Sequence, residues 1–238
     1  MMKGNALRFL LWLALSAFST WSASAQDAPA TRNEFWPEIN VYFHPGPKLR
    51  LYLMGTVSRE REGAHILADE PFEGYAGAHL DFIPNKNVIL RTGYRYGSSL
   101  NGADPFKEHR IVVEQTLRRL WPGKFLLSDR NRQDFRFVDG DYSFRYRNRL
   151  TLEREFVFRE RAMTPYTSGE LYFDSRFNIW NRNRYAFGLQ LHLRRKGPLQ
   201  DLLPKHQVIL DLYYMRQNDS RSSIQHVNAI GMVWSLYF

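Results

Sequence analysis

Apolar and polar residues alternate with period two along most of the chain, a pattern typical of strands with one apolar and one polar face. No segment shows the 3.6-residue period of an amphipathic helix. Turn-forming residues such as His44-Pro45-Gly46-Pro47 and Val138-Asp139-Gly140-Asp141 separate the alternating segments. The pattern predicts strands near Glu34–Phe43, Lys48–Ser58, Phe72–Ile83, Asn87–Tyr96, Lys107–Leu120, Lys124–Phe137, Tyr142–Phe158, Tyr166–Phe177, Arg184–Arg195, His206–Gln217 and His226–Phe238.

The segment Tyr142–Phe158 indicates what each face contacts. One face carries mostly aromatic residues and leucine, although Asn148 and Arg154 also fall on it. Lipid cannot solvate the opposite face, and a soluble sandwich cannot bury it. We therefore predict that this polar face lines a polar lumen. It consists of Ser143, Arg145, Arg147, Arg149, Thr151, Glu153 and Glu155.

The last residues of the chain form another alternating segment that ends on an aromatic residue. Ile230, Met232, Trp234, Leu236 and Phe238 share one face. This end resembles the closing strand of bacterial outer-membrane barrels, in which the terminal Phe is an assembly signal read by the barrel-assembly machinery. The alternative is the last strand of a soluble sandwich.

The first residues read as an export signal. Lys3 and Arg8 make the start of the chain positive, and the apolar run Phe9–Phe18 follows them. This run is too short to span a bilayer, and Ala23-Ser24-Ala25 offers a cleavage site. We expect a signal peptide at residues 1–25 and a single barrel domain at residues 26–238, located in the outer membrane. A membrane anchor is the alternative to a cleaved signal.

Composition fits this class. The 238 residues include no Cys, which excludes disulfides and thiol chemistry. Aromatic residues make up 15% of the chain, enough for the outer band and interfacial girdles of a barrel. A net charge of +9 is also typical of nucleic-acid binding, but the basic residues lie within alternating strands, so we expect no nucleic-acid partner.

The strand number is ambiguous. Single-chain bacterial barrels usually have an even number. Pro37 interrupts the first segment, and Ser128–Arg136 is polar on both faces, which suggests a strand end beyond the bilayer or a bulge. We predict an all-β, transmembrane, antiparallel up-and-down β-barrel with an even strand number of about twelve, or alternatively ten.

Charged residues on the predicted inner faces lead to two hypotheses. In the first, Arg–carboxylate pairs fill a narrow lumen and the barrel is structural. In the second, excess Arg makes a porin-like passive channel for small anionic solutes. We expect the isolated Gly93, Gly169 and Gly188 to relieve crowding inside the barrel. The lumen-lining candidates are Arg91, Arg95, Arg110, Glu114, Arg145, Arg147, Arg149, Glu153, Glu155, Glu170, Asp174, Arg176, Arg184 and His192.

Several ordered motifs resemble a known family. They run from Phe35-Trp36-Pro37-Glu38 to the final Phe238, and include Arg145–Arg154, Glu170–Asp174 and Tyr213–Gln217. Other parts are Ser128–Arg132, Thr164–Tyr166 and Asn181–Tyr185. Together they resemble the bacterial outer-membrane proteins of domain of unknown function family 2490. The resemblance implies an outer-membrane barrel with no assigned activity and no known site residues.

An enzyme is a third hypothesis. His79, His192, His206 or His226 could serve a Ser nucleophile acting on lipid, but no spacing pairs them and no nucleophile motif is present. We therefore expect no catalytic residue, no cofactor and no metal ion. The expected partners are outer-membrane lipid, the barrel-assembly machinery during biogenesis and, for a channel, small anionic solutes.

Overall fold

The computed structural model describes residues 31–60, 71–101, 105–158, 161–193 and 207–238. The predicted signal peptide and His206 lie outside the described residues. The described chain is built of β1 (Thr31–Gly46), β2 (Leu49–Glu60), β3 (Pro71–Asn85), β4 (Val88–Ser99), β5 (Lys107–Trp121), β6 (Phe125–Val138), β7 (Asp141–Arg154), β8 (Phe156–Phe158), β9 (Arg161–Asp174), β10 (Ile179–Leu193), β11 (Gln207–Asp219) and β12 (His226–Tyr237).

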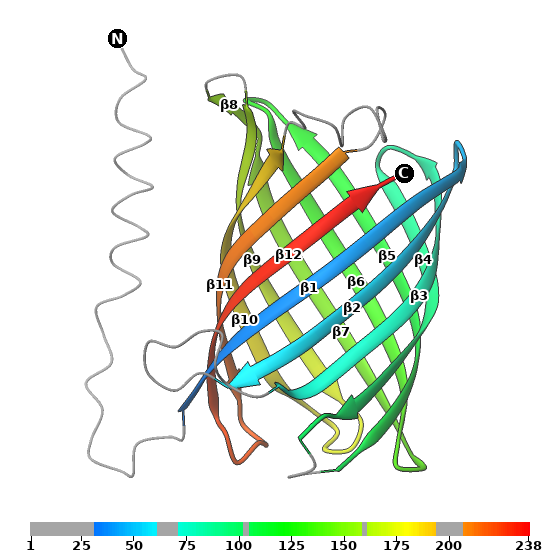
Figure 1. Ribbon diagram of the computed structural model, residues 1–238, viewed down its shortest axis with the longest axis vertical. Helices are drawn as coiled ribbons and strands as arrows, with labels where there is room; N and C mark the ends of the chain where they lie inside the picture. The colour runs from blue at the N-terminus through cyan, green and yellow to red at the C-terminus, as the bar shows by residue number, and fades with distance from the viewer. Residues whose placement is uncertain (1–30, 61–70, 102–104, 159–160, 194–206) are drawn as a thin grey trace.

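The strands form one closed barrel (Figure 1). Each strand pairs with its neighbours in sequence, and β12 returns to β1. Both β7 and the three-residue β8 pair with β9, so the two lie in one line that is broken at Glu155. The predicted all-β barrel of twelve strands is thus confirmed. The circuit that closes it has eleven members, and they correspond to the eleven alternating segments of the sequence.

The barrel closes with a parallel pair. Phe35 lies opposite Ile230 and Tyr42 opposite Tyr237, with both strands running the same way. All other neighbouring strands are antiparallel, as predicted. An odd circuit of up-and-down strands must close in this way, because its first and last members point in the same direction. The total of twelve strands is even, as expected, but the closed circuit has eleven members because β7 and β8 share one place in it.

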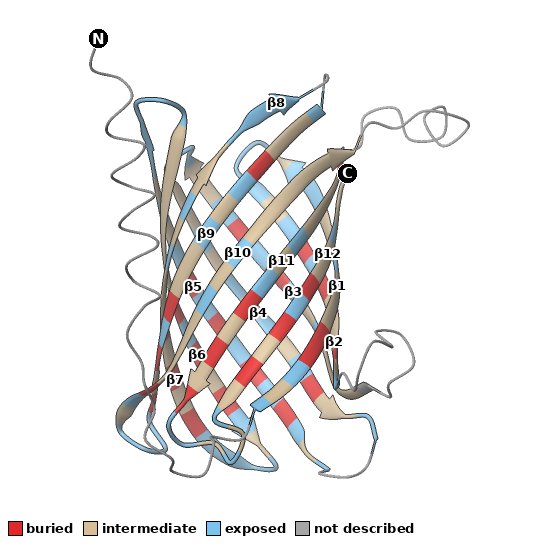
Figure 2. Cartoon of the chain, turned by 90° about the vertical axis from the view of Figure 1, so that its left-hand side faces the viewer, coloured by how far each residue is buried: buried red, intermediate tan, exposed pale blue. Residues whose placement is uncertain are grey.

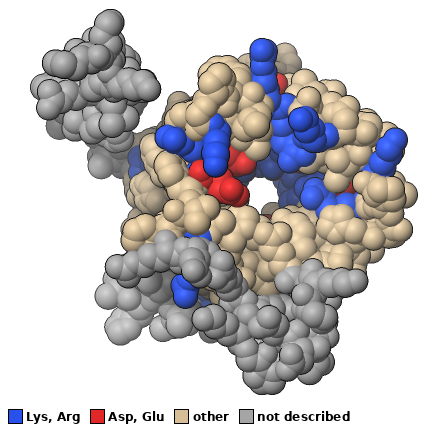
Figure 3. Space-filling model, turned by 90° about the horizontal axis from the view of Figure 1, so that it is seen from above, with Lys and Arg blue, Asp and Glu red and all other residues tan. Residues whose placement is uncertain are grey.

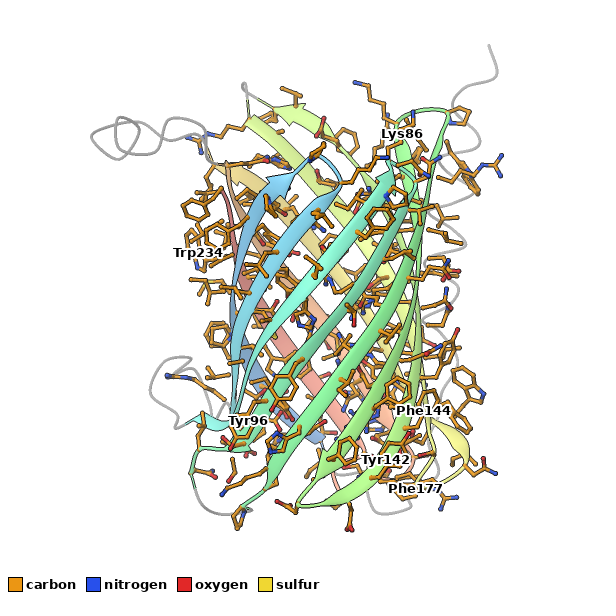
Figure 4. All side chains as sticks on the ribbon, turned by 90° about the vertical axis from the view of Figure 1, so that its right-hand side faces the viewer. Lys86, Tyr96, Tyr142, Phe144, Phe177 and Trp234 are labelled. Carbon is orange, nitrogen blue, oxygen red and sulfur yellow. The ribbon has the colours of Figure 1, made fainter. Side chains whose placement is uncertain are left out.

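The parallel closure places the start of β1 and the end of β12 at opposite ends of the barrel (Figure 1). Lys86, in the β3–β4 turn, marks one end, and Tyr142, after the β6–β7 turn, marks the other (Figure 4). Phe238 lies at the Lys86 end and Thr31 at the Tyr142 end. Among the described residues, no helix is long and apolar enough to cross a membrane.

Burial alternates along the strands (Figure 2). Large apolar side chains are exposed on the outside, among them Leu80, Ile111, Leu150 and Phe187. Buried polar and charged side chains outnumber buried apolar ones in the described chain, and Asp81, Asp134 and Asp174 are fully buried. The barrel is therefore apolar outside and polar inside, the reverse of a soluble core.

The segment Ser128–Arg136 is neither a strand end nor a bulge. It occupies the middle of β6, and its pairing with β5 and β7 runs without a register shift. Its inward residues join the lumen, whereas Asp129, Asn131 and Gln133 point outward. Both suggestions made from the sequence are wrong, because the polar outer positions lie at mid-strand.

Inward glycines lie opposite rings on the neighbouring strand. Tyr166 pairs with Gly188 and Tyr213 with Gly231, and a Cβ on either glycine would overlap the ring. Gly93 is covered by His79 in the same way. Gly93 and Gly188 thus relieve crowding as expected, whereas Gly169 lies on the outer face opposite Tyr185 and has no close neighbour.

Candidate functional site: the arginine-lined lumen

The barrel encloses a polar cavity of 660 Å³. Tyr, Ser and Glu side chains line part of it, but Arg is the most frequent residue in its wall. Nine of the lumen candidates from the sequence line this cavity, namely Arg91, Arg95, Arg110, Arg145, Arg147, Arg149, Glu170, Arg176 and Arg184. Alternation brings eight of them together, because each occupies an inward position of its strand, whereas Arg176 lies in the turn between β9 and β10.

Glu170 on β9 holds three arginines from neighbouring strands. Its carboxylate oxygens lie 2.9 Å from Arg130 Nη2, 2.9 Å from Arg147 Nη2 and 2.8 Å from Arg149 Nη2. The Tyr172 hydroxyl donates a hydrogen bond to Glu170 Oε2 at 2.7 Å, which is the fourth contact of this carboxylate. Glu170 is 2% exposed, so its carboxylate is largely removed from water, whereas Arg130 and Arg149 are partly exposed to the cavity. It joins β6, β7 and β9 through side chains in addition to the backbone ladder.

Other buried carboxylates extend the network around the wall. Asp134 accepts a hydrogen bond from Arg132 Nε at 2.6 Å and lies 3.8 Å from Arg110 and from Arg147. Contacts of 4.0 Å or less connect the network from Asp81 on β3 to Asp174 on β9. A buried carboxylate needs such partners, since leaving it without them is costly.

Most carboxylates of the network lie behind the arginines. Asp81, Glu108, Glu114, Asp134 and Asp174 are buried and do not belong to the cavity wall, whereas their Arg partners other than Arg50 do. Five other carboxylates do line the cavity, namely Glu34, Glu38, Glu73, Glu170 and Asp211. Viewed along the barrel, basic side chains gather around the central opening, and a group of acidic side chains also borders it (Figure 3). Arg is the most frequent residue in the cavity wall, so a solute would meet mainly guanidinium groups. Two predicted residues, Glu114 and Asp174, belong to the network but not to the cavity surface.

Two arginines that line the cavity have no carboxylate within 4.0 Å among the described residues. Arg95 donates to His79 Nε2 at 3.1 Å. Arg184 donates to Gln217 Oε1 at 2.7 Å and lies 5.0 Å above the Trp36 ring. These two side chains add positive charge to the cavity wall that no near carboxylate balances.

A row of stacked rings covers the opposite wall. It crosses four neighbouring strands, from His79 through Tyr52 and Tyr42 to Tyr237, with ring centroids 5.1, 4.8 and 4.5 Å apart. This row was not predicted. Its sequence signal is that each ring occupies the polar, inward face of its strand, where an aromatic residue is unexpected in a water-filled lumen.

Asp81 joins the ring row to the arginine network. It accepts from Arg50 Nη2 at 2.6 Å and from Arg91 Nε at 2.6 Å. The two guanidinium groups lie over rings of the row, Arg91 at 4.3 Å from the Tyr52 centroid and Arg50 at 4.9 Å from that of Tyr42. Cation–π contact and ion pairing thus fix the same two side chains.

Three further predicted lumen residues lie outside both the cavity wall and the ion-pair network. Glu155 is exposed at the break between β7 and β8. Glu153 has no arginine within 4.0 Å among the described residues. His192 borders a separate 460 Å³ apolar pocket with Met163 and Leu191, and its Nδ1 lies 2.7 Å from Gln207 Nε2. Strict alternation misplaced Glu155 because it continued one strand through the break.

The predicted assembly signal lies on the outer face of β12. Ile230 and Trp234 are exposed there, whereas Met232 and Leu236 are partly covered. Phe238 continues past the strand: its N–H donates to the Tyr42 carbonyl at 2.8 Å and its ring stacks on Phe43 at 5.3 Å. The terminal residue is thus attached to β1 across the parallel seam.

Within the described residues, no hydrogen bond joins a Ser side chain to His79, His192 or His226. His79 is part of the ring row, and His192 lies in the separate pocket. The described part of the chain holds no group of three or more His, Cys, Asp or Glu that could bind a metal ion. The absence of enzyme activity remains a prediction.

Comparison with known proteins identifies the family. One solved structure with a match is the crystal structure of the beta domain of the Bordetella autotransporter Brka, with 14% identity, a TM-score of 0.40 and coverage of 81% of this chain and 83% of that one. This likeness is too weak to support a functional argument. No curated protein matches. A family model described as protein of unknown function (DUF2490) matches residues 20–228, and the chain belongs to this family.

Proposed function

We propose that the protein is an outer-membrane barrel whose lumen passes small anionic solutes by passive diffusion. The exposed Leu, Ile, Phe and Trp side chains on its outer wall support insertion in lipid, because a protein surrounded by water would bury them. The predicted export signal and the aromatic end of the chain support the outer membrane in particular.

The arrangement of charges in the lumen is the observation that carries the proposal. Arginines line the cavity, and most of their carboxylate partners are buried behind them. Arg95 and Arg184, in the same wall, have no carboxylate within 4.0 Å among the described residues. Guanidinium groups bind carboxylates and phosphates through paired hydrogen bonds, so a small anion suits this wall.

The ion-pair network supports a second candidate, a barrel with a structural role in the envelope. It joins the inner wall from β2 to β9. However, side chains that filled the lumen would leave no cavity, and the observed 660 Å³ falls within the range of about 300–1,000 Å³ found for ligand pockets. The ion-pair network therefore fits the wall of an open passage better than it fits a lumen filled by side chains.

Conductance of the purified protein in planar bilayers tests the proposal. We expect steady conductance with a preference for anions. Arg184→Glu should shift the reversal potential in a salt gradient toward cations, because Arg184 faces the cavity and its loss breaks no ion pair. Arg119→Glu, on the exposed outer face of β5, is the matched control and should leave selectivity unchanged. Folded protein without conductance would favour the structural role.

A further inference from the structure

The outer wall carries a polar cluster at the middle of three neighbouring strands. Its members occupy outward positions of β5, β6 and β7, and adjacent members are register partners or lie two residues apart on one strand. We call this set the outer polar cluster, and it consists of Gln115, Asp129, Asn131, Gln133, Tyr146 and Asn148.

Hydrogen bonds organise the centre of this cluster. Asn148 Nδ2 donates to Asp129 Oδ1 at 2.7 Å and to Asn131 Oδ1 at 3.1 Å, and Asn131 Nδ2 donates to Asp129 Oδ2 at 3.2 Å. The Tyr146 hydroxyl donates to Asn131 Oδ1. Asp129 has no cationic side chain within 4.0 Å among the described residues. The centre is thus a carboxylate held by amides alone.

Apolar residues lie on both sides of the cluster along the barrel. Leu117 and Leu150 are the cross-strand partners of Asp129, and Val113 is a partner of Gln133. All three are exposed on the outer face. Asn131 lies near the midpoint of β6, so the cluster belongs to the middle of the wall and not to a rim. In a bilayer this is the depth at which polar groups are least tolerated.

The flanking glutamines are exposed at the same level. Gln115 is the register partner of Asn131, and Gln133 that of Tyr146. No hydrogen-bond partner for either side-chain amide is found within the described ranges. Acyl chains offer such groups neither donors nor acceptors, whereas a protein surface can.

We propose that the outer polar cluster is the interface at which a second copy of this chain binds in the membrane. This proposal rests on the placement of the barrel in lipid proposed above. A two-fold axis along the membrane normal brings the same residues of two copies to the same depth. The cluster contains both a carboxylate acceptor and amide donors, so it complements itself: Gln133 or Gln115 of one copy can donate to Asp129 of the other.

Cross-linking of single-cysteine variants in native membranes tests the interface. The chain contains no Cys, so Gln133→Cys introduces one unique thiol. The matched control is Leu212→Cys, which is also outward, exposed and near mid-strand, but on β11. With a short bifunctional maleimide we expect a dimer of this chain for Q133C and only monomer for L212C. Monomer for both, equal dimer for both, or adducts with other proteins would each overturn the second copy as occupant.

A second variant tests the contribution of the amides. Gln115→Leu combined with Gln133→Leu removes the amides that would reach Asp129 of the second copy, and should convert the detergent-extracted dimer to monomer while the heat-modifiable migration of a folded barrel is kept. A folded double variant that remains dimeric would contradict the proposal. Fractionation of the Gln133→Cys protein also separates the two proposals: recovery in the soluble fraction would contradict membrane insertion, whereas insertion without cross-linking would contradict the interface alone.

Discussion

At the scale of single residues, packing inside the barrel depends on glycines covered by rings. Gly231→Ala should destabilise the barrel by about 1–3 kcal/mol, because the new methyl group overlaps the Tyr213 ring. Gly169→Ala is the control, since the nearest side-chain atom to its new Cβ is 3.9 Å away. Denaturant unfolding in detergent measures both. Equal stability of the two variants would show that Tyr213 moves aside without cost.

Glu170 offers a second test at this scale, because it serves three arginines at once. Glu170→Ala leaves Arg130, Arg147 and Arg149 without this carboxylate and should lower the free energy of unfolding by about 3–5 kcal/mol. Glu153→Ala, at a position with no arginine within 4.0 Å in the described chain, should have a much smaller effect. If Glu153→Ala lowered the free energy of unfolding as much as Glu170→Ala, the loss of ion pairs would not explain the destabilisation.

At the scale of elements, the end of β12 combines the predicted assembly signal with a structural contact. Deleting Phe238 removes the backbone bond to Tyr42 and the ring contact with Phe43, so we expect impaired insertion and loss of heat-modifiable migration. Phe43→Ala removes only the ring contact. If both variants assemble equally poorly, the terminal residue acts through packing. If the deletion alone fails to insert, the ring contact is not the cause, and the terminal residue acts through its recognition or its backbone bond to Tyr42.

The strands and the lumen show which features alternation can predict. Period two located every strand and the inward face of most of them, since each position depends only on its own segment. Alternation could not predict which pairs form, so the Glu170 clamp and the ring row from His79 to Tyr237 became visible only with the register. The direction of closure depends on the whole circuit. The break at Glu155 interrupts the pattern without any turn residue to mark it.

At the scale of the whole molecule, the eleven-member circuit fixes which loops share an end of the barrel. Thr31 lies at the Tyr142 end, whereas Lys86 and Phe238 lie at the other (Figures 1 and 4). If the closing strand ends at the periplasm, an impermeant maleimide should label Thr31→Cys and Asp141→Cys in intact cells but not Lys86→Cys. Thr31→Cys behaving like Lys86→Cys would instead indicate an even, fully antiparallel circuit.

The parallel seam also has a consequence for the order of folding. Each antiparallel pair joins strands that follow one another in the chain, with β8 continuing β7, whereas the seam joins residues 195 positions apart, such as Asn33 and Asn228. Contacts of such separation are the costliest in chain entropy and form late. The nascent protein therefore passes through an open, curved sheet with two unsatisfied edges. An assembly factor would accelerate folding most by covering these two edges until β1 and β12 pair.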